Sequence, residues 1–185
     1  MEIIGVYLPI ILYALEGFML DRICFIGHRE IEITTKLKES ITIFIENLIQ
    51  KENAYIFLFG SRSEFDKLCY DIVTKLKEKY SYILRVYVRS SYENIDASYE
   101  KYLLENYEKT FFPKRCKSSG KSSYIQRNQA MIDASDFCIF YYNEKCLPKR
   151  NITKNEVLAN KPKSGTAIAY KYAIQKKKSI KNFYQ

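Results

Sequence analysis

Short apolar runs alternate with segments of helical periodicity along most of this chain. Residues 56–59, 83–88 and 137–142 are mostly continuous apolar runs rather than alternating ones. Such runs are typical of strands that are buried on both faces of a parallel sheet. Shorter runs at residues 22–26 and 179–184 predict two further strands, the second of them at an edge. The pattern therefore predicts a sheet of about five parallel strands.

Helical periodicity fills the segments between these runs. Apolar residues recur three and four positions apart in two stripes, Leu37, Ile41, Phe44, Ile45 and Leu48, and then Phe65, Leu68, Cys69, Ile72, Val73 and Leu76. Residues 122–134 and 166–177 predict two more helices. Strand and helix thus alternate, which indicates a single α/β domain with a doubly wound sheet. We predict the strand order 3-2-1-4-5, with residues 22–26 in the centre.

Composition narrows the chemistry. The chain has 185 residues and a net charge of +9, so an anionic partner such as a nucleotide, a nucleic acid or a membrane surface fits, although a solvated basic face is the alternative. Five cysteines form no CxxC pair, and His28 is the only histidine. We therefore expect no metal site and no cofactor, and a location in the reducing cytoplasm.

The first twenty residues are mostly apolar but are interrupted by Gly5, Pro9, Glu16 and Gly17. We interpret residues 1–20 as an appended helix or as a leader upstream of a start at Met19. The alternative is a membrane anchor, because the apolar stretch approaches the length of a span. Contact with a membrane is not expected. The domain itself is predicted to cover residues 21–185, with a basic insertion at residues 143–163.

Glycine, serine and arginine follow the predicted strands. The turns are Gly27-His28-Arg29, Gly60-Ser61-Arg62-Ser63 and Arg89-Ser90-Ser91. In an open parallel sheet the carboxyl ends of the strands line the ligand crevice, so these turns favour a pocket for a phosphate-bearing molecule. Ordinary polar turns are the alternative reading.

A second feature of the same kind lies near the end of the chain. Ser164-Gly165-Thr166 opens a helix of small residues after a basic loop. Gly165 has no Cβ to keep a ligand away, and the free N–H groups of a first helical turn attract anions. A helix cap without a ligand is the competing interpretation.

In this order the motifs resemble the SLOG superfamily, the Rossmann-like group that includes the Lonely Guy (LOG) phosphoribohydrolases and the DNA-processing protein A family. The YpsA-like branch is the most similar. The resemblance extends from Arg22 to the C-terminus. Gly27-His28-Arg29 matches the first-strand turn, GSRSEFD at residues 60–66 matches GGARGxD, Arg127 to Met131 with Ser135-Asp136 matches R-x-x-x-M…SD, and Ser164-Gly165-Thr166 matches GGxGT.

The resemblance implies recognition of a nucleotide-derived signal, including NAD-derived signals in bacterial or phage defence. Gly165 and Thr166 would hold phosphate, Arg127 would pair with it, and His28 and Arg29 would meet ribose or a second phosphate. The full set of implied ligand-binding residues is Gly27, His28, Arg29, Gly60, Ser61, Arg127, Asn128, Ser164, Gly165 and Thr166.

Two departures from the family pattern argue against catalysis. LOG-type hydrolases place a glutamate after the glycine loop, where this chain has Ala169, and a methyl group cannot perform acid–base chemistry. Ser61 and Glu64 stand where the family has glycines, which narrows the room for a pyrophosphate. A binding module without turnover, containing no catalytic residue, is therefore the favoured prediction.

Two alternatives stay open. An N-glycoside hydrolase or transferase would need Asp66, Asp133 or Asp136 in place of the glutamate, although Asp66 fits a helix start and Asp136 a cap. Single-stranded nucleic acid could bind the basic residues Lys114, Arg115, Lys117 and Lys121, which interleave with the aromatic residues Tyr107, Phe111, Phe112 and Tyr124. A homo-oligomer is open as well.

Overall fold

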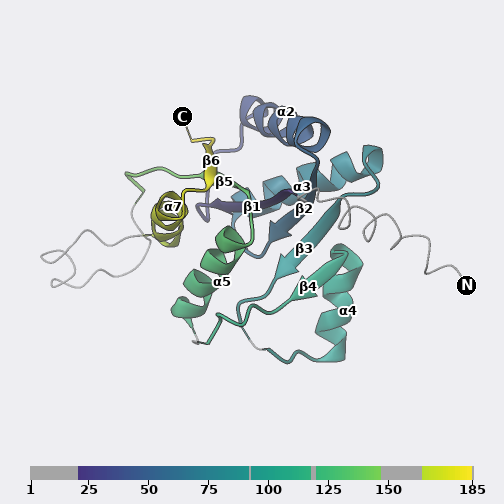
Figure 1. The fold of residues 1–185 in the computed structure, drawn as a ribbon, viewed down its shortest axis with the longest axis vertical. Helices are drawn as coiled ribbons and strands as arrows, with labels where there is room; N and C mark the ends of the chain where they lie inside the picture. Colours follow the sequence, from purple (N-terminus) through teal and green to yellow (C-terminus); the bar gives the residue numbers. More distant parts are fainter. Residues whose placement is uncertain (1–20, 92, 118–119, 147–163, 185) are drawn as a thin grey trace, which may run out of the picture.

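The computed structural model describes residues 21–91, 93–117, 120–146 and 164–184. Its centre is a six-stranded sheet in the order β4-β3-β2-β1-β5-β6, in which every neighbouring pair is parallel (Figure 1). The strands are β1 (Asp21–Gly27), β2 (Ala54–Phe59), β3 (Leu84–Val88), β4 (Lys109–Phe111), β5 (Phe137–Tyr141) and β6 (Ser179–Asn182).

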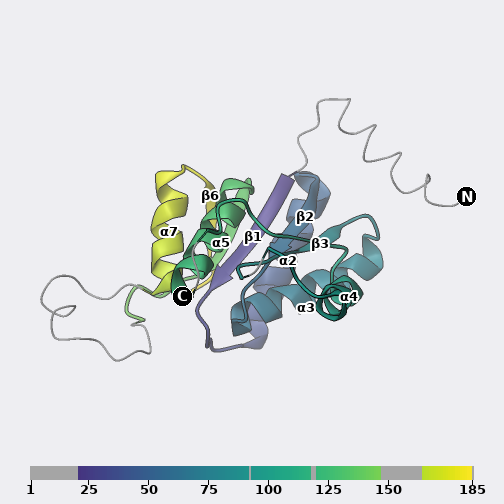
Figure 2. The same cartoon turned by 90° about the horizontal axis from the view of Figure 1, so that it is seen from below.

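Helices cover both faces of this sheet. The described helices are α2 (Thr35–Lys51), α3 (Glu64–Lys79), α4 (Ala97–Asn106), α5 (Lys121–Asp133) and α7 (Gly165–Gln175). Figure 2 shows α5 and α7 together on one side of β1, with α2, α3 and α4 on the other. This is the Rossmann-like, doubly wound arrangement that the alternating pattern predicts, and the fold class is confirmed.

The predicted strand order is also confirmed. The five predicted strands correspond to β1, β2, β3, β5 and β6, and they lie in the order 3-2-1-4-5 with β1 between β2 and β5. Apolar burial explains the central position, because Ile23, Cys24 and Phe25 of β1 are all completely buried. The part of a strand that is enclosed on both faces and both edges must be apolar.

Two elements were not predicted. β4 contains only Lys109, Thr110 and Phe111 and adds a sixth strand beside β3, and it is too short and too polar to show an apolar run. Helix α4 buries only Leu103, so it has no apolar stripe that would reveal it. Both lie at the exposed edge of the sheet.

Each face of the sheet has its own core. The α2 and α3 side packs large side chains such as Phe25, Phe57 and Phe65, whereas the α5 and α7 side uses smaller ones, including Cys24, Cys138 and Ala173. Small residues let α5 and α7 pack closely against the sheet and against each other. That closeness allows a side chain from α5 to reach the end of β2.

Some predictions concern residues outside the described part. Residues 1–20 and most of the basic insertion, residues 147–163, lie there. Among the helices within the described residues, none combines the length and apolar character that crossing a membrane requires.

Candidate functional site

The glycine turns after β1 and β2 and the start of α7 lie at one edge of the sheet, where the parallel strands end. The hydroxyl of Thr166 donates a hydrogen bond to the carbonyl of Gly27 over 3.0 Å. The start of α3 reaches the same turn, because the N–H of Glu64 donates to the carbonyl of Arg29 over 2.9 Å. Neighbouring strands are about 4.8 Å apart, so the turns after β1 and β2 are within the span of one small ligand.

His28 connects the turns after β1 and β5. Its Nε2 lies 2.9 Å from the backbone nitrogen of Asn143 and 3.2 Å from the carbonyl oxygen of the same residue. Burial lowers the pKa of His28, and the backbone contact with Asn143 offsets this only in part. The contact with Asn143 fastens the two strand ends together. Arg29 has an exposed side chain at the same turn. Contacts of these two residues with ribose or phosphate stay predictions.

Among the described residues, nothing packs over the glycine in the first turn of α7. Ser164 caps the helix, because its Oγ accepts the N–H of Ala167 over 3.1 Å. A Cβ built on Gly165 would meet no heavy atom within 4 Å among the described residues. Packing therefore does not require glycine here. The space over the first turn fits the predicted approach of a phosphate group.

Arg127 crosses from α5 to the end of β2 and is almost fully buried, with 3% of its surface exposed. Its Nη1 donates to the carbonyl of Gly60, and its Nε donates to Oδ1 of Asn128 over 2.9 Å. Its guanidinium also lies 5.9 Å from the ring centre of Tyr124. A side chain on Gly60 would come within 2.7 Å of this guanidinium and 2.6 Å of the Val88 carbonyl. Because Gly60 has no side chain, the Arg127 guanidinium has room beside it.

Asp66 lies near Arg127 but arises from the opposite face of the sheet. It is the third residue of α3, and its N–H donates to the hydroxyl of the capping residue Ser63 over 3.1 Å, so its predicted position at a helix start is confirmed. Only 3% of Asp66 is exposed, and its Oδ1 has no hydrogen-bond partner among the described residues.

The charge state of Asp66 depends on two opposing influences. Burial raises its pKa from 3.8 to about 7, while the nearby Arg127 and the backbone N–H groups of Ser61 and Gly60 lower it. Burial also lowers the pKa of Arg127, and the charge of Asp66 opposes this. Perturbed ionisable groups of this kind concentrate at functional sites.

Tyrosine rings surround the other side of Asp66. Tyr107 lies 5.0 Å from Tyr70 and 5.1 Å from Tyr87, measured between ring centres. Burial raises the pKa of Tyr87 to about 12 and raises that of Tyr107 further, with the charge of Asp66 adding to both shifts. These phenols are neutral at physiological pH. They present flat, partly apolar surfaces with polar tips.

An open cleft of about 330 Å³ lies between the start of α3 and these rings. It is lined by Ser61, Arg62, Ser63, Glu64, Asp66, Lys67, Tyr70 and Tyr107. The volume is near the lower limit of small-molecule pockets, which run from roughly 300 to 1,000 Å³. The cleft therefore fits one nucleoside-sized group rather than a dinucleotide.

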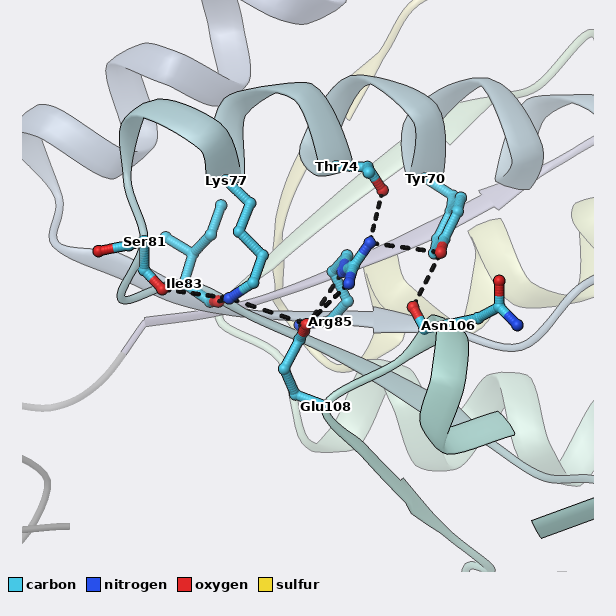
Figure 3. A network of polar contacts seen from close by, with 8 residues as sticks. All are labelled: Tyr70, Thr74, Lys77, Ser81, Ile83, Arg85, Asn106 and Glu108. Carbon is cyan, nitrogen blue, oxygen red and sulfur yellow. Dashed lines mark hydrogen bonds and ion pairs between the residues drawn. The ribbon is translucent and has the colours of Figure 1, made fainter. Parts of the chain in front are cut away.

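A polar network that includes the Tyr70 hydroxyl connects α3, β3 and the end of α4 (Figure 3). Arg85 of β3 donates to Glu108 through Nη2 over 2.7 Å and through Nε over 3.3 Å, and also to Thr74 of α3 over 2.9 Å. The Tyr70 hydroxyl completes the network by donating to the Asn106 carbonyl over 2.8 Å. Burial works against the charged form of Glu108, but the hydrogen bonds from Arg85 outweigh it and lower the pKa of Glu108.

The other carboxylates proposed as substitutes for the missing glutamate lie elsewhere. Asp133 pairs with Arg115 and accepts from the Tyr172 hydroxyl over 2.9 Å. Asp136 accepts the N–H of Arg22 over 2.9 Å, at the start of β1. Ala169 is 1% exposed within the core between α7 and the sheet, so this position faces packed apolar atoms.

Sequence reasoning placed most of these residues but missed the buried cluster. It assigned Asp66 to a helix start without burying it, and it did not identify Tyr70 or Tyr87. A usable signal was present. Asp66 stands three positions before Cys69 and seven before Val73, so helical periodicity puts it on the buried stripe of α3.

Within the described residues, no group of three or more histidine, cysteine, aspartate or glutamate side chains is placed to hold a metal ion. A scan against protein-family models and a search of curated proteins both find no match for this chain. The resemblance to the SLOG superfamily therefore rests on the motifs alone.

Proposed function

We propose that the carboxyl edge of this sheet binds a nucleotide-derived, phosphate-bearing small molecule and does not turn it over. The observation that carries the proposal is the buried pair of Arg127 and Asp66 beside the cleft. Burial of charged groups costs free energy unless they are fully paired, and Oδ1 of Asp66 has no partner within the described part of the chain. Arg127 and Asp66 each shift the pKa of the other, and buried groups that are perturbed in this way concentrate at functional sites.

Three further observations support this proposal. None of the described residues fills the space beside Gly165 in the first turn of α7, and helix N-termini favour phosphate. The net charge of +9 favours anions over the whole surface. The cleft supplies aromatic and hydroxyl groups for the uncharged part of a nucleotide. The SLOG-like motifs agree with this division, because their glycine loop is the expected phosphate end.

Replacing Gly165 with aspartate is expected to weaken binding of AMP and ADP-ribose at least tenfold while the protein stays folded. A carboxylate in the first turn stabilises the helix dipole but repels a phosphate at the same place. The matched control is Ala97→Asp, which adds the same charge at the first residue of α4, an exposed position on the helix that contacts the edge strand β4. Isothermal titration calorimetry measures both variants.

Equal weakening by the two variants would show that diffuse positive charge, and not a site, binds the nucleotide. No binding by the unmodified protein would overturn the proposal. The nucleic-acid alternative would be supported instead if the protein binds long single-stranded DNA with an affinity that falls steeply as the salt concentration rises, and mononucleotides show no such fall.

One observation favours an N-glycoside hydrolase as a second candidate. Of the three carboxylates considered, only Asp66 interacts with Arg127. A protonated Asp66 would donate its proton to the departing base while water attacks C1′ of the ribose, so that the C1′–N bond breaks and the C1′–O bond forms; the proton that the water loses would return to the Asp66 carboxylate. The same incubations with AMP and ADP-ribose test this, because released base is measured by chromatography. Release that disappears in Asp66→Asn would replace the binding-module proposal.

A further inference from the structure

We propose that the protein self-associates head to tail, with the acidic face of α4 in one copy against the basic end of α7 in the next. The acidic face consists of Glu100, Tyr102, Leu104 and Glu105, and the basic end consists of Lys171, Ile174 and Lys177. α4 contacts one edge strand of the sheet, β4, whereas α7 ends shortly before the other edge strand, β6. Because the two helices lie at opposite ends of the sheet (Figure 1), only a second copy brings these surfaces together.

Helix α4 packs only lightly against the rest of the described chain. Of its ten residues only Leu103 is buried, whereas Tyr102 is 59% exposed and Leu104 is 51% exposed. A helix of this length is marginal in water, and proteins stabilise such helices mainly by packing an apolar face. Packing against another molecule supplies the contacts that the described part of the chain does not.

The α4 segment is acidic, although the whole chain is basic. Residues 93–108 contain five acidic residues and one basic residue, whereas the net charge of the chain is +9. Residues three or four positions apart are neighbours on a helix surface, so the exposed Glu105 lies beside Tyr102 and the exposed Glu100 beside Leu104. Both of these apolar side chains thus have an acidic neighbour. This combination fits a partner surface that is both basic and partly apolar.

The basic end of α7 has both properties. Ile174 is 55% exposed. Lys171 precedes it by three positions and Lys177 follows it by three, and both lysines are exposed. The end of α7 therefore presents an apolar side chain between two cations, which is the counterpart of the apolar and acidic neighbours on α4.

Cations outnumber carboxylates around this end of α7. The carboxylate of Asp133, at the end of α5, forms ion pairs with Arg115 and Lys176. Lys178 donates to the carbonyl of the same residue over 3.2 Å. One carboxylate thus faces three cations, which leaves an excess of positive charge that attracts the acidic face of α4.

Charge also determines how the copies are arranged. Two copies with a net charge of +9 repel each other, and pairing two identical surfaces would place carboxylates against carboxylates or cations against cations. Opposite charges meet when α4 of one copy contacts α7 of the next. Such a heterologous contact leaves a free α4 and a free α7 in every open assembly, so association continues beyond the dimer unless a ring closes.

Sedimentation velocity of the full chain without nucleotide tests this inference. Because one helix face forms the contact, association is expected to be weak, with the weight-average mass rising about twofold between about 20 and 500 μM in about 0.1 M NaCl. In about 1 M NaCl the mass is expected to stay near that of the monomer, since salt screens exposed charges. A mass that stays at the monomer value throughout the lower-salt series would overturn the inference.

Charge-reversal variants identify the two surfaces. One variant reverses α4 through Glu100→Lys and Glu105→Lys, and the other reverses α7 through Lys171→Glu and Lys177→Glu. Each variant alone is expected to lose association. An equal mixture of the two is expected to regain it, because each surface then meets an oppositely charged one in the other variant. Recovery in the mixture also shows that both variants are folded.

The matched control is Lys36→Glu with Lys38→Glu, which changes the net charge as the α7 reversal does but at two exposed positions of a different helix, α2. This variant is expected to associate like the unmodified protein. The inference would be contradicted by association that survives either reversal, that is lost in the control, or that does not return in the mixture.

Discussion

Replacing Gly27 with alanine is expected to lower the free energy of unfolding by about 3 kcal/mol, the upper part of the range for overpacked cores. The new Cβ would lie 2.5 Å from both Cγ and Cδ1 of Phe65 and closer still to its Cβ. Phe65 is completely buried at the start of α3, and its Cβ cannot move without the helix. The strain therefore reaches the neighbouring residue, Asp66.

The matched control is Gly165→Ala, at the glycine that begins α7. Nothing within 4 Å opposes its Cβ among the described residues, and alanine is the better helix former by about 0.5–1 kcal/mol. Urea denaturation is expected to show a large loss of unfolding free energy for Gly27→Ala and no loss for Gly165→Ala. Equal midpoints would mean that α3 does not pack against the turn as described.

Replacing Arg127 with methionine is expected to lower the free energy of unfolding by about 3–5 kcal/mol at pH 8 and by clearly less at pH 5. The change removes the donor to the Gly60 carbonyl and leaves the Asp66 carboxylate without its buried counter-charge. At pH 5 Asp66 is protonated and needs no counter-charge. Denaturation in urea at the two pH values measures the difference.

The sign of this dependence follows from the raised pKa of Asp66. Between pH 4 and 7 the folded protein holds a proton on Asp66 that the unfolded chain has lost, so the free energy of unfolding falls as the pH rises. A change from 3.8 to about 7 corresponds to about 4 kcal/mol over that range. Asp66→Asn removes this contribution. The loss of unfolding free energy caused by Arg127→Met is also measured in the Asp66→Asn variant at pH 8. A loss equal to that in the unmodified protein would show that the two residues are not coupled.

Most of the fold followed from apolar pattern because its strands are enclosed on both faces. β1, β2 and β5 must be continuously apolar to be buried between two helix layers, and their order follows from the way the chain crosses the sheet. The two elements that the pattern did not predict, β4 and α4, lie at the edge of the sheet. Lys109 of β4 is exposed there, and Leu103 is the buried residue of α4. Edge elements carry a weak apolar pattern, so pattern alone does not reveal them.

The candidate site was predictable only in part, for a different physical reason. Glycine and serine turns mark where strands end, and Gly27, Gly60 and Thr166 do meet at one edge. What a turn motif cannot show is whether glycine serves a ligand or a neighbouring side chain. Gly27 makes room for Phe65 and Gly60 for Arg127, whereas Gly165 has no such neighbour in the part of the chain that the structure describes. The residues that interact electrostatically with Asp66, including Tyr87, Tyr107 and Arg127, are far away in the sequence.

The most direct test of the account is to locate the bound nucleotide on the protein. In a ¹H–¹⁵N NMR titration of the full chain with ADP-ribose at pH 8, the largest and saturable shifts are expected at the carboxyl edge, on the amides of Gly27, Gly60, Ser61, Asp66, Gly165 and Thr166. The amides of Lys77, Asp133 and Lys178, at the opposite edge of the sheet, are expected to stay in place. Shifts spread over the basic surface, or largest at the opposite edge, would contradict the account, as would no saturable shift with ADP-ribose, AMP or NAD.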